Sequence, residues 1–273
     1  MADHQLRAMT WNVWWRFGPR WRDRQPALLA TMTRFTPDVL ALQEVWSASD
    51  GTQADEFAHA LGLHAAFAGP SYPAAPDPAG QPDHEQIDLG LALLSRWPIL
   101  DRRVLPMPAR HRNWKPVVLT ATVAHPAGPL PIVVACLEHA TVYSDDRIAQ
   151  ARLLADLATD PAFDGPCPVV VLGDLNAAPD SAVLRPLRDV LVDAWRAGGG
   201  AADAVTLPST HPSAPLEAGP ELVDQRIDHV LFRPGQEDQR VIVESATLAG
   251  DPVDGVYPSD HRAVVCDLRW RNR

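Results

Sequence analysis

The sequence predicts an α/β fold class that is rich in β-strands and has few helices. Short apolar runs bounded by glycine, proline or polar residues recur along the chain, whereas three segments show the spacing of an amphipathic helix. Paired strand signals with turns between them predict β-hairpins, and hairpins interspersed with occasional helices argue against a strictly alternating parallel sheet. A chain of 273 residues with 46% hydrophobic content can bury a large core, as one large domain or two small ones.

The N-terminal part of the chain contains two predicted strands, each followed by a predicted helix. Residues 6–13 alternate between apolar and polar side chains, which predicts a strand. Residues 23–35 carry a proline near the first turn and an apolar face, as a helix would. Residues 39–43 form a short apolar strand that leads into Glu44 in the following loop. Residues 53–61 are predicted to form the second helix.

The middle of the chain contains two predicted hairpins. They follow residues 69–82, which hold five prolines and two glycines and are therefore expected to form a long surface loop. Residues 89–95 and 101–105 are expected to pair with each other across a Trp-Pro turn. Residues 117–123 and 130–137 are expected to form the second hairpin, across a turn that contains proline and glycine.

The C-terminal half contains the clearest helix and three further strands. Residues 144–159 begin with two aspartates, where carboxylates complement the exposed backbone N–H groups, and continue with a buried apolar stripe. Residues 169–172 are a fully apolar strand. Residues 198–220 are rich in glycine, alanine and proline and show no periodicity, so they are expected to form a loop. Residues 227–232 and 264–268 are the remaining predicted strands.

The net charge weighs against nonspecific binding to DNA. The protein carries a formal charge of −10, with one lysine among 24 basic residues, whereas a protein that binds DNA through its phosphates usually has a basic face. A segment rich in arginine and tryptophan nevertheless occurs at residues 14–24, and a basic segment with two arginines, a histidine, a tryptophan and the lysine occurs at residues 110–115. The first is either a recognition rim or a helix-entry loop whose tryptophans are buried. A locally basic entrance remains compatible with an anionic substrate.

The chain is expected to be a cytoplasmic monomer. No run approaches the roughly 18 apolar residues of a membrane span, and the first residues lack the basic and then apolar pattern of a secretory signal. The cysteines, Cys136, Cys167 and Cys266, are odd in number and lack the spacing of a zinc site. They are therefore expected to be reduced.

Six short motifs, spread over nearly the full length, each contain a metal ligand or a proton-handling residue. In order, they are Thr10-Trp11-Asn12, Leu42-Gln43-Glu44, the segment around His139, Gly173-Asp174-Leu175-Asn176, Ile227-Asp228-His229 and Pro258-Ser259-Asp260-His261. Taken singly, each has an ordinary explanation, because asparagine and aspartate after a strand commonly stabilise a turn. Together, in this order and at these spacings, they resemble the endonuclease/exonuclease/phosphatase superfamily, the DNase I-like metal-dependent phosphoesterases.

This resemblance extends from about residue 10 to about residue 264 and implies both a fold and a reaction. The implied fold is a four-layer α/β sandwich, in which two packed mixed β-sheets are flanked by helices, formed as a single domain over residues 1–273. The implied activity is hydrolysis of a phosphodiester or phosphomonoester by metal-assisted attack of water. The implied cofactor is Mg²⁺, with Mn²⁺ as a substitute, because acidic and amide side chains supply the oxygen ligands that these ions prefer.

The resemblance assigns three residues to the metal site. Glu44 would hold Mg²⁺, since the Leu-Gln-Glu motif puts an acid at the end of a buried strand. Asn12 and Asp260 would complete or brace the site.

Four further residues are assigned to the chemistry in the same way. Asp174 would orient or deprotonate the attacking water, and Asn176 would hydrogen-bond the phosphate or the nucleophile. His261 would contact the scissile phosphate. Asp228 would orient His261 and favour its protonated form.

Two other histidines differ in their assignment. His139 would contact the phosphate or stabilise the transition state, although the family commonly has Thr-His-Leu here and this chain has Glu138 before the histidine. His229, which also follows an aspartate, is expected to brace the fold.

The residues leave several alternatives open. A zinc hydrolase could use His139, His229, His261, Asp174 and Asp260, but no Cys/His pairing with zinc spacing supports it. The substrate class is undecided between DNA or RNA, as for a nuclease, and a lipid phosphodiester, as for a sphingomyelinase-like enzyme. A catalytically silent binding scaffold is the third alternative, and retention of the acidic and histidine residues argues against it.

Overall fold

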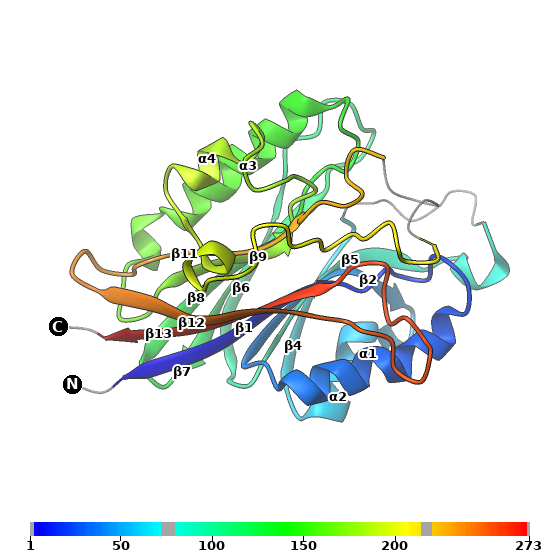
Figure 1. Ribbon diagram of the computed structural model, residues 1–273, viewed down its shortest axis with the longest axis horizontal. Helices are drawn as coiled ribbons and strands as arrows, with labels where there is room; N and C mark the ends of the chain where they lie inside the picture. The colour runs from blue at the N-terminus through cyan, green and yellow to red at the C-terminus, as the bar shows by residue number, and fades with distance from the viewer. Residues whose placement is uncertain (1–2, 72–79, 214–219, 272–273) are drawn as a thin grey trace.

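Two mixed β-sheets pack face to face, and helices cover both outer faces (Figure 1). This computed structural model describes residues 3–71, 80–213 and 220–271. The four-layer α/β sandwich expected from the sequence is therefore confirmed.

The first sheet contains the strands in which the chain begins and ends. Its order is β12 (Arg240–Ala249), β13 (Ala263–Arg271), β1 (His4–Asn12), β2 (Val39–Ala48), β5 (Asp88–Ser95) and β4 (His64–Ala68), with the short β3 (Gly51–Thr52) beside β2. The strands β1 and β2 are parallel, and the other pairs are antiparallel. Because β1 and β2 run in the same direction side by side, their C-terminal ends meet at one edge of the sandwich.

The second sheet is built mainly from the middle of the chain. Its order is β10 (Val192–Asp193), β11 (Asp228–Arg233), β9 (Val169–Asp174), β8 (Gly128–Cys136), β7 (Val117–His125) and β6 (Ile99–Pro106). Here β8 and β9 are the parallel pair. The end of β9 pairs with the beginning of β11, so that Asp174 lies opposite Asp228.

The core lies between the sheets and extends beneath the helices. Leu6 and Ala8 of β1 face the second sheet, whereas the alternate residues Met9 and Trp11 pack under the helices of the first sheet. This alternation follows from the two-residue period of a strand. Both faces of the central strands are therefore buried, which holds the strand ends rigidly.

Helices α1 (Trp21–Phe35) and α2 (Gln53–Leu61) cover the first sheet, and α3 (Ser144–Ala158) and α4 (Arg185–Arg188) cover the second (Figure 1). The short α5 (Ala194–Ala197) follows β10, and single 3₁₀ turns occur at Pro82–His84 and Pro161–Phe163. The N-terminus of α2 is fixed by a capping box between Thr52 and Asp55. None of the helices in the described residues is long and apolar enough to cross a membrane.

Most predicted elements are present, but two predictions were wrong. The hairpin between residues 89–95 and 101–105 does not form, because β5 pairs with β2 and β4 in the first sheet while β6 pairs with β7 in the second. The strand at 39–43 does not end before Glu44, because β2 continues to Ala48 through an irregularity at Glu44. The strands β4 and β12 had not been predicted.

Other predictions agree with the structure. The hairpin of β7 and β8 forms, and α1, α2 and α3 lie within two residues of their expected bounds. The three cysteines are free and buried, as expected. Much of the loop predicted at 69–82 and part of that at 198–220 lie outside the described residues; the described part of the second loop contains no named helix or strand.

Candidate active site

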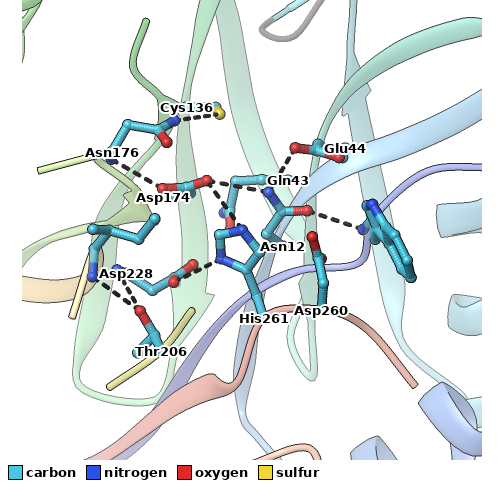
Figure 2. Close-up of polar contacts among 12 residues, drawn as sticks. Asn12, Gln43, Glu44, Cys136, Asp174, Asn176, Thr206, Asp228, Asp260 and His261 are labelled. Atoms are coloured by element: carbon cyan, nitrogen blue, oxygen red, sulfur yellow. Dashed lines mark hydrogen bonds and ion pairs between the residues drawn. The ribbon is translucent and has the colours of Figure 1, made fainter. Parts of the chain in front are cut away.

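The six motifs meet at one end of the sandwich, where strands of both sheets begin or end. Asn12 ends β1, Asp174 ends β9, and Asp228 begins β11, while His261 lies just before β13. Figure 2 shows these side chains converging on one another from strands that are far apart in the sequence. The site therefore depends on both sheets and on their packing.

Glu44 reaches the site through a bulge in β2. The register of β2 against β5 shifts between Gln43 and Val45, and Glu44 adopts a φ of 56°. A positive φ is costly for a residue with a side chain, and such strain is concentrated at functional sites. The bulge turns the Glu44 carboxylate toward Asn12, whose side-chain amide donates a hydrogen bond of 2.7 Å to it.

Asn12 is held in place by the backbone of the next segment. Its Oδ1 accepts a hydrogen bond of 2.9 Å from the Trp14 N–H, and its Nδ2 donates to both Glu44 and Asp174. Because its oxygen is engaged with Trp14, Asn12 acts in this arrangement as a brace for the two carboxylates.

Asp174 is a buried carboxylate whose charge is only partly compensated. Its two oxygens accept hydrogen bonds from the Asn176 N–H at 2.9 Å and from Asn12 at 3.1 Å. Burial, and then the neighbouring Asp228, raise the pKa of Asp174 to about 7. This carboxyl group can therefore exchange a proton near neutral pH.

His261 and Asp228 form a buried carboxylate–imidazole pair. Nδ1 of His261 lies 2.9 Å from Oδ2 of Asp228, and Nε2 lies 4.0 Å from Oδ2 of Asp174. Burial alone would lower the pKa of His261, but Asp228, Asp260 and Asp174 outweigh it and hold the pKa well above its usual value. His261 is therefore expected to be a cation in this site.

Asp260 brings a fourth acidic side chain to the cluster. Ser259 connects this segment to β1, because its hydroxyl donates a hydrogen bond of 2.7 Å to the Asn12 carbonyl. Burial raises the pKa of Glu44 well above its usual value, and the negative charge of Asp260 adds to this effect. A buried carboxylate beside a second negative charge, as Glu44 is beside Asp260, is stabilised by a positive charge nearby.

The donor set fits a hard divalent cation. Polar atoms of Asp174, Asp228 and His261 lie within 4.8 Å of one another, and Glu44 and Asp260 add further carboxylates to the same end of the sandwich. Because His261 is protonated, the carboxylates are the candidate ligands. Carboxylate oxygens are the ligands that Mg²⁺ and Mn²⁺ prefer.

His139 lies on the wall of the cavity. This cavity, of about 240 Å³, is also lined by Glu44, Asp174, Asn176 and His261. Nδ1 of His139 lies 3.5 Å from the fully buried carboxylate of Glu138.

Glu138 itself is held by a two-pronged ion pair. Its carboxylate accepts hydrogen bonds of 2.6 and 2.8 Å from the Arg112 guanidinium. Glu138, which stands where the family commonly has threonine, thus connects the segment after β8 that carries His139 to the basic segment at 110–115.

Several contributing residues were not identified as site residues from the sequence. Arg147 in α3 donates a hydrogen bond to the carbonyl of the predicted site residue Asn176, which has a φ of 47°. Thr206 accepts hydrogen bonds from the backbone of Ile227 and Asp228 and so fixes the beginning of β11. The spacing of Arg147 in α3 could have indicated its position, whereas Thr206 lies in a loop without periodicity and gave no signal.

The segment at residues 14–24 is mainly a packed entry to α1. Trp14 and Trp15 are buried, and the buried guanidinium of Arg24 donates hydrogen bonds to the carbonyls of residues 13, 14, 15, 17 and 258. Trp14 and Phe17 nevertheless line the cavity with Leu207 and Leu222, so one wall of the site is apolar.

His229 is a structural residue. Its Nε2 lies 2.9 Å from the Ala177 carbonyl, and its Nδ1 lies 3.1 Å from the Arg226 guanidinium. Burial, together with Arg226, lowers the pKa of His229 to about 4. It is therefore neutral and connects β11 to the segment after β9, as expected.

A family model for the Endonuclease/Exonuclease/phosphatase family matches residues 9–261. The chain belongs to this family. Members of the Endonuclease/Exonuclease/phosphatase family are phosphoester hydrolases, and all eight predicted site residues lie within the matched range. No sequence among the curated proteins matches the chain significantly.

Solved structures of the family share the fold over nearly the whole chain. An endonuclease/exonuclease/phosphatase protein from Beutenbergia cavernae is 26% identical, with a TM-score of 0.72 over 97% of this chain and 71% of that one. TDP2 from D. rerio, crystallised with a single-strand DNA product, is 20% identical, with a TM-score of 0.75 over 97% and 98% of the two chains. The human Nocturnin catalytic domain, with bound sulfate, is 21% identical, with a TM-score of 0.73 over 98% and 94%.

Proposed function

We propose that this protein is a Mg²⁺-dependent phosphoesterase that hydrolyses a phosphodiester by attack of water. The observation that carries the proposal is the convergence in one cavity of Asp174, which Asn12 braces, and His261, which is paired with Asp228. Asp174 has a pKa of about 7, and His261 has a pKa well above its usual value. A base and an acid whose pKa values are shifted by their surroundings are typical of a hydrolytic site that works near neutral pH.

Each residue has a distinct role in this proposal. Asp174, oriented by Asn12 and by the Asn176 N–H, accepts a proton from the attacking water. His261, held by Asp228, donates a hydrogen bond to a phosphate oxygen and stabilises its growing charge. Asn176 and His139 contact the phosphate from the cavity wall.

Glu44, braced by Asn12 and adjacent to Asp260, would hold Mg²⁺, which supplies the positive charge that neutralises the phosphate. The same site would accept Mn²⁺. The pKa of Glu44 is raised first by burial and then by Asp260, and a bound cation would stabilise the ionised carboxylate against both effects.

The proposal is tested by Mg²⁺-dependent hydrolysis of a substrate panel, with Asp174→Ala as the inactive reference. The panel contains single-stranded and duplex DNA, RNA, sphingomyelin, phosphoinositides and a chromogenic phosphodiester. Asp238→Asn is a matched control, because Asp238 is an exposed acid in the turn between β11 and β12, at the opposite end of β11 from the site. Cleavage that is lost in Asp174→Ala and retained in Asp238→Asn supports the proposal. Equal rates for the wild type and Asp174→Ala on every substrate would refute it and favour a binding scaffold.

A nuclease is the second candidate. It is favoured by the basic segment at 110–115, whose Arg112 is fixed to Glu138 beside His139, and by the DNA product bound to D. rerio TDP2. The nucleic acids in the panel decide this point, since a nuclease would cleave them faster than the small diester.

A further inference from the structure

A second cavity, of about 640 Å³, lies beside the catalytic one. Asp260 lines both cavities. The second cavity is formed by the segment at 199–211 on one side and by residues 246–262 on the other. A group attached to a phosphate in the catalytic cavity is therefore within reach of this space.

Aromatic side chains connect the two cavities. Trp14 lines the catalytic cavity, and Tyr257 lines the larger one. The His211 ring lies between them in edge-to-face contact with both, with centroid distances of 5.7 Å to Trp14 and 4.8 Å to Tyr257. Tyr257 is 39% exposed, so much of its side chain is available to a ligand.

Within the part of the chain that the structure describes, one ring nitrogen of His211 makes no hydrogen bond. The side chain is 5% exposed, and its Nδ1 accepts a hydrogen bond of 3.1 Å from the Ser213 N–H. Its Nε2, which then carries the proton, has no hydrogen-bond partner among the described residues. Because leaving a buried donor unsatisfied is costly, a ligand acceptor would gain from meeting it.

The charges around the larger cavity disfavour a second phosphate. Among the described residues that line it, Arg262 is the one arginine or lysine, and its guanidinium is engaged by Asp251 at 2.8 Å. Asp203 and Asp260 also line the cavity. The carboxylates would repel the next phosphate of a nucleic acid strand, which is a polyanion.

Two glycines in the wall of the larger cavity, Gly199 and Gly200, have backbone positions that favour glycine. A Cβ atom at Gly200 would lie 2.2 Å from the Trp195 ring, so only glycine allows the backbone to lie flat on the indole here. Gly199 adopts a φ of 73°, which favours glycine for a second reason.

We infer that the larger cavity binds an ester group of the substrate, and that this group is an uncharged ring rather than a neighbouring nucleotide. The ring packs against Tyr257, and a polar atom on it accepts a hydrogen bond from His211. The substrate is then a small or terminal phosphodiester with a single phosphate at the site. This inference rests on the proposed phosphodiesterase function and specifies its substrate class.

The test uses three p-nitrophenyl phosphodiesters that differ in the second ester group, which is methyl, phenyl or phosphoethyl. The phenyl diester should have a kcat/KM about tenfold or more above that of the methyl diester, as expected for burial of a ring in a fitted cavity. The phosphoethyl diester should be the poorest of the three. Equal values for phenyl and methyl, or a preference for phosphoethyl, would overturn the inference while leaving the phosphodiesterase function intact.

Two variants test whether the larger cavity causes the preference for the phenyl diester over the methyl diester. Tyr257→Ala should reduce the ratio of phenyl to methyl kcat/KM toward one. Tyr143→Ala is the matched control, because Tyr143 stacks on His111 in the basic segment, and it should leave the ratio unchanged. A ratio that responds to Tyr143→Ala and not to Tyr257→Ala would contradict the assignment.

A binding measurement separates failure of the function from failure of the inference. If none of the diesters is hydrolysed faster by the wild type than by Asp174→Ala, the proposed function fails. Calorimetric titration of the Mg²⁺-supplemented protein with phenyl phosphate and with methyl phosphate then decides the cavity assignment. Tighter binding of phenyl phosphate that is lost in Tyr257→Ala supports it, and equal affinities overturn it.

Discussion

Replacing Asp174 with asparagine should stabilise the metal-free protein by an amount that grows with pH. Burial and Asp228 raise the pKa of Asp174 from 3.8 to about 7 on folding. Below 3.8 the carboxyl is protonated in both states and destabilises neither. As the pH rises from 3.8 to about 7, the unfolded chain releases a proton that the folded chain retains, so stability falls throughout this interval.

The magnitude follows from the size of this pKa shift. At about 1.4 kcal/mol per unit, the carboxyl group costs the folded state about 4 kcal/mol at pH 8 and about 1.5 kcal/mol at pH 5. Asparagine keeps an acceptor for the Asn176 N–H but offers an N–H group where Asn12 now donates, which costs about 1 kcal/mol. The net gain for Asp174→Asn is therefore about 3 kcal/mol at pH 8 and less than about 1 kcal/mol at pH 5.

The assay is urea unfolding in the presence of EDTA at both pH values, with the free energy of unfolding obtained by linear extrapolation. Asp238→Asn is again the control, because it removes an exposed charge and should change stability little at either pH. Added Mg²⁺ should reduce the difference in free energy of unfolding between the wild type and Asp174→Asn, since a cation offsets the repulsion among the buried carboxylates. A variant that is less stable than the wild type at both pH values, or a gap that is the same at both, would refute the reasoning.

Three further changes test other parts of the site. Glu44→Gln should raise the Mg²⁺ concentration for half-maximal rate by about tenfold or more, because it removes a charged ligand, and an unchanged metal titration would count against Glu44. Asp228→Asn removes the first of the anions that raise the pKa of His261, so the alkaline limb of the pH–rate profile should move to lower pH. An alkaline limb at unchanged pH would argue against His261 as the acid. Arg24→Met should lower the free energy of unfolding by about 3 kcal/mol in urea, because it removes the guanidinium that donates to the carbonyls of residues 14, 15 and 17. A loss below about 1 kcal/mol would show that water replaces the guanidinium.

The strand ends could be predicted from the sequence because the polar residues interrupt apolar runs. Asn12 and Asp174 each follow a run of buried residues, and a polar side chain at that point is readable without a structure. The pairing of Asp228 with His261 is different, since 33 residues separate them. It was expected only from the resemblance to the family, and no local pattern could have predicted it.

The bulge at Glu44 could not be predicted, because the pattern around it is continuously buried. Gln43, Glu44 and Val45 are all inaccessible to solvent or nearly so, and periodicity gives no sign of an extra residue in a strand that is buried on both faces. The same reason accounts for the wrong hairpin. Residues 89–95 pair with strands distant in sequence, and nothing in a buried apolar run distinguishes a local partner from a distant one.

The strand β12 and the larger cavity could not be predicted either, because neither is marked by a local sequence pattern. In β12, buried, half-buried and exposed residues are mixed, because it is the edge strand of its sheet, so it lacks the apolar run that identified the others. The larger cavity is lined mainly by loop residues whose positions depend on tertiary contacts such as that between Gly200 and Trp195.

The antiparallel pairing of β1 with β13 also determines where the protein can be tethered. His4 lies opposite Trp270 at one end of the sandwich. The catalytic end is at the other end of both strands, where β1 finishes at Asn12 and β13 starts after His261. A nine-residue strand spans about 30 Å, so Asp3 and Arg271, which form an ion pair, are far from the cavity that opens beside Glu44. A fusion partner or an immobilising tag on either side of this pair would therefore face away from incoming substrate, and a short linker joining them would allow new chain ends to be opened elsewhere on the surface.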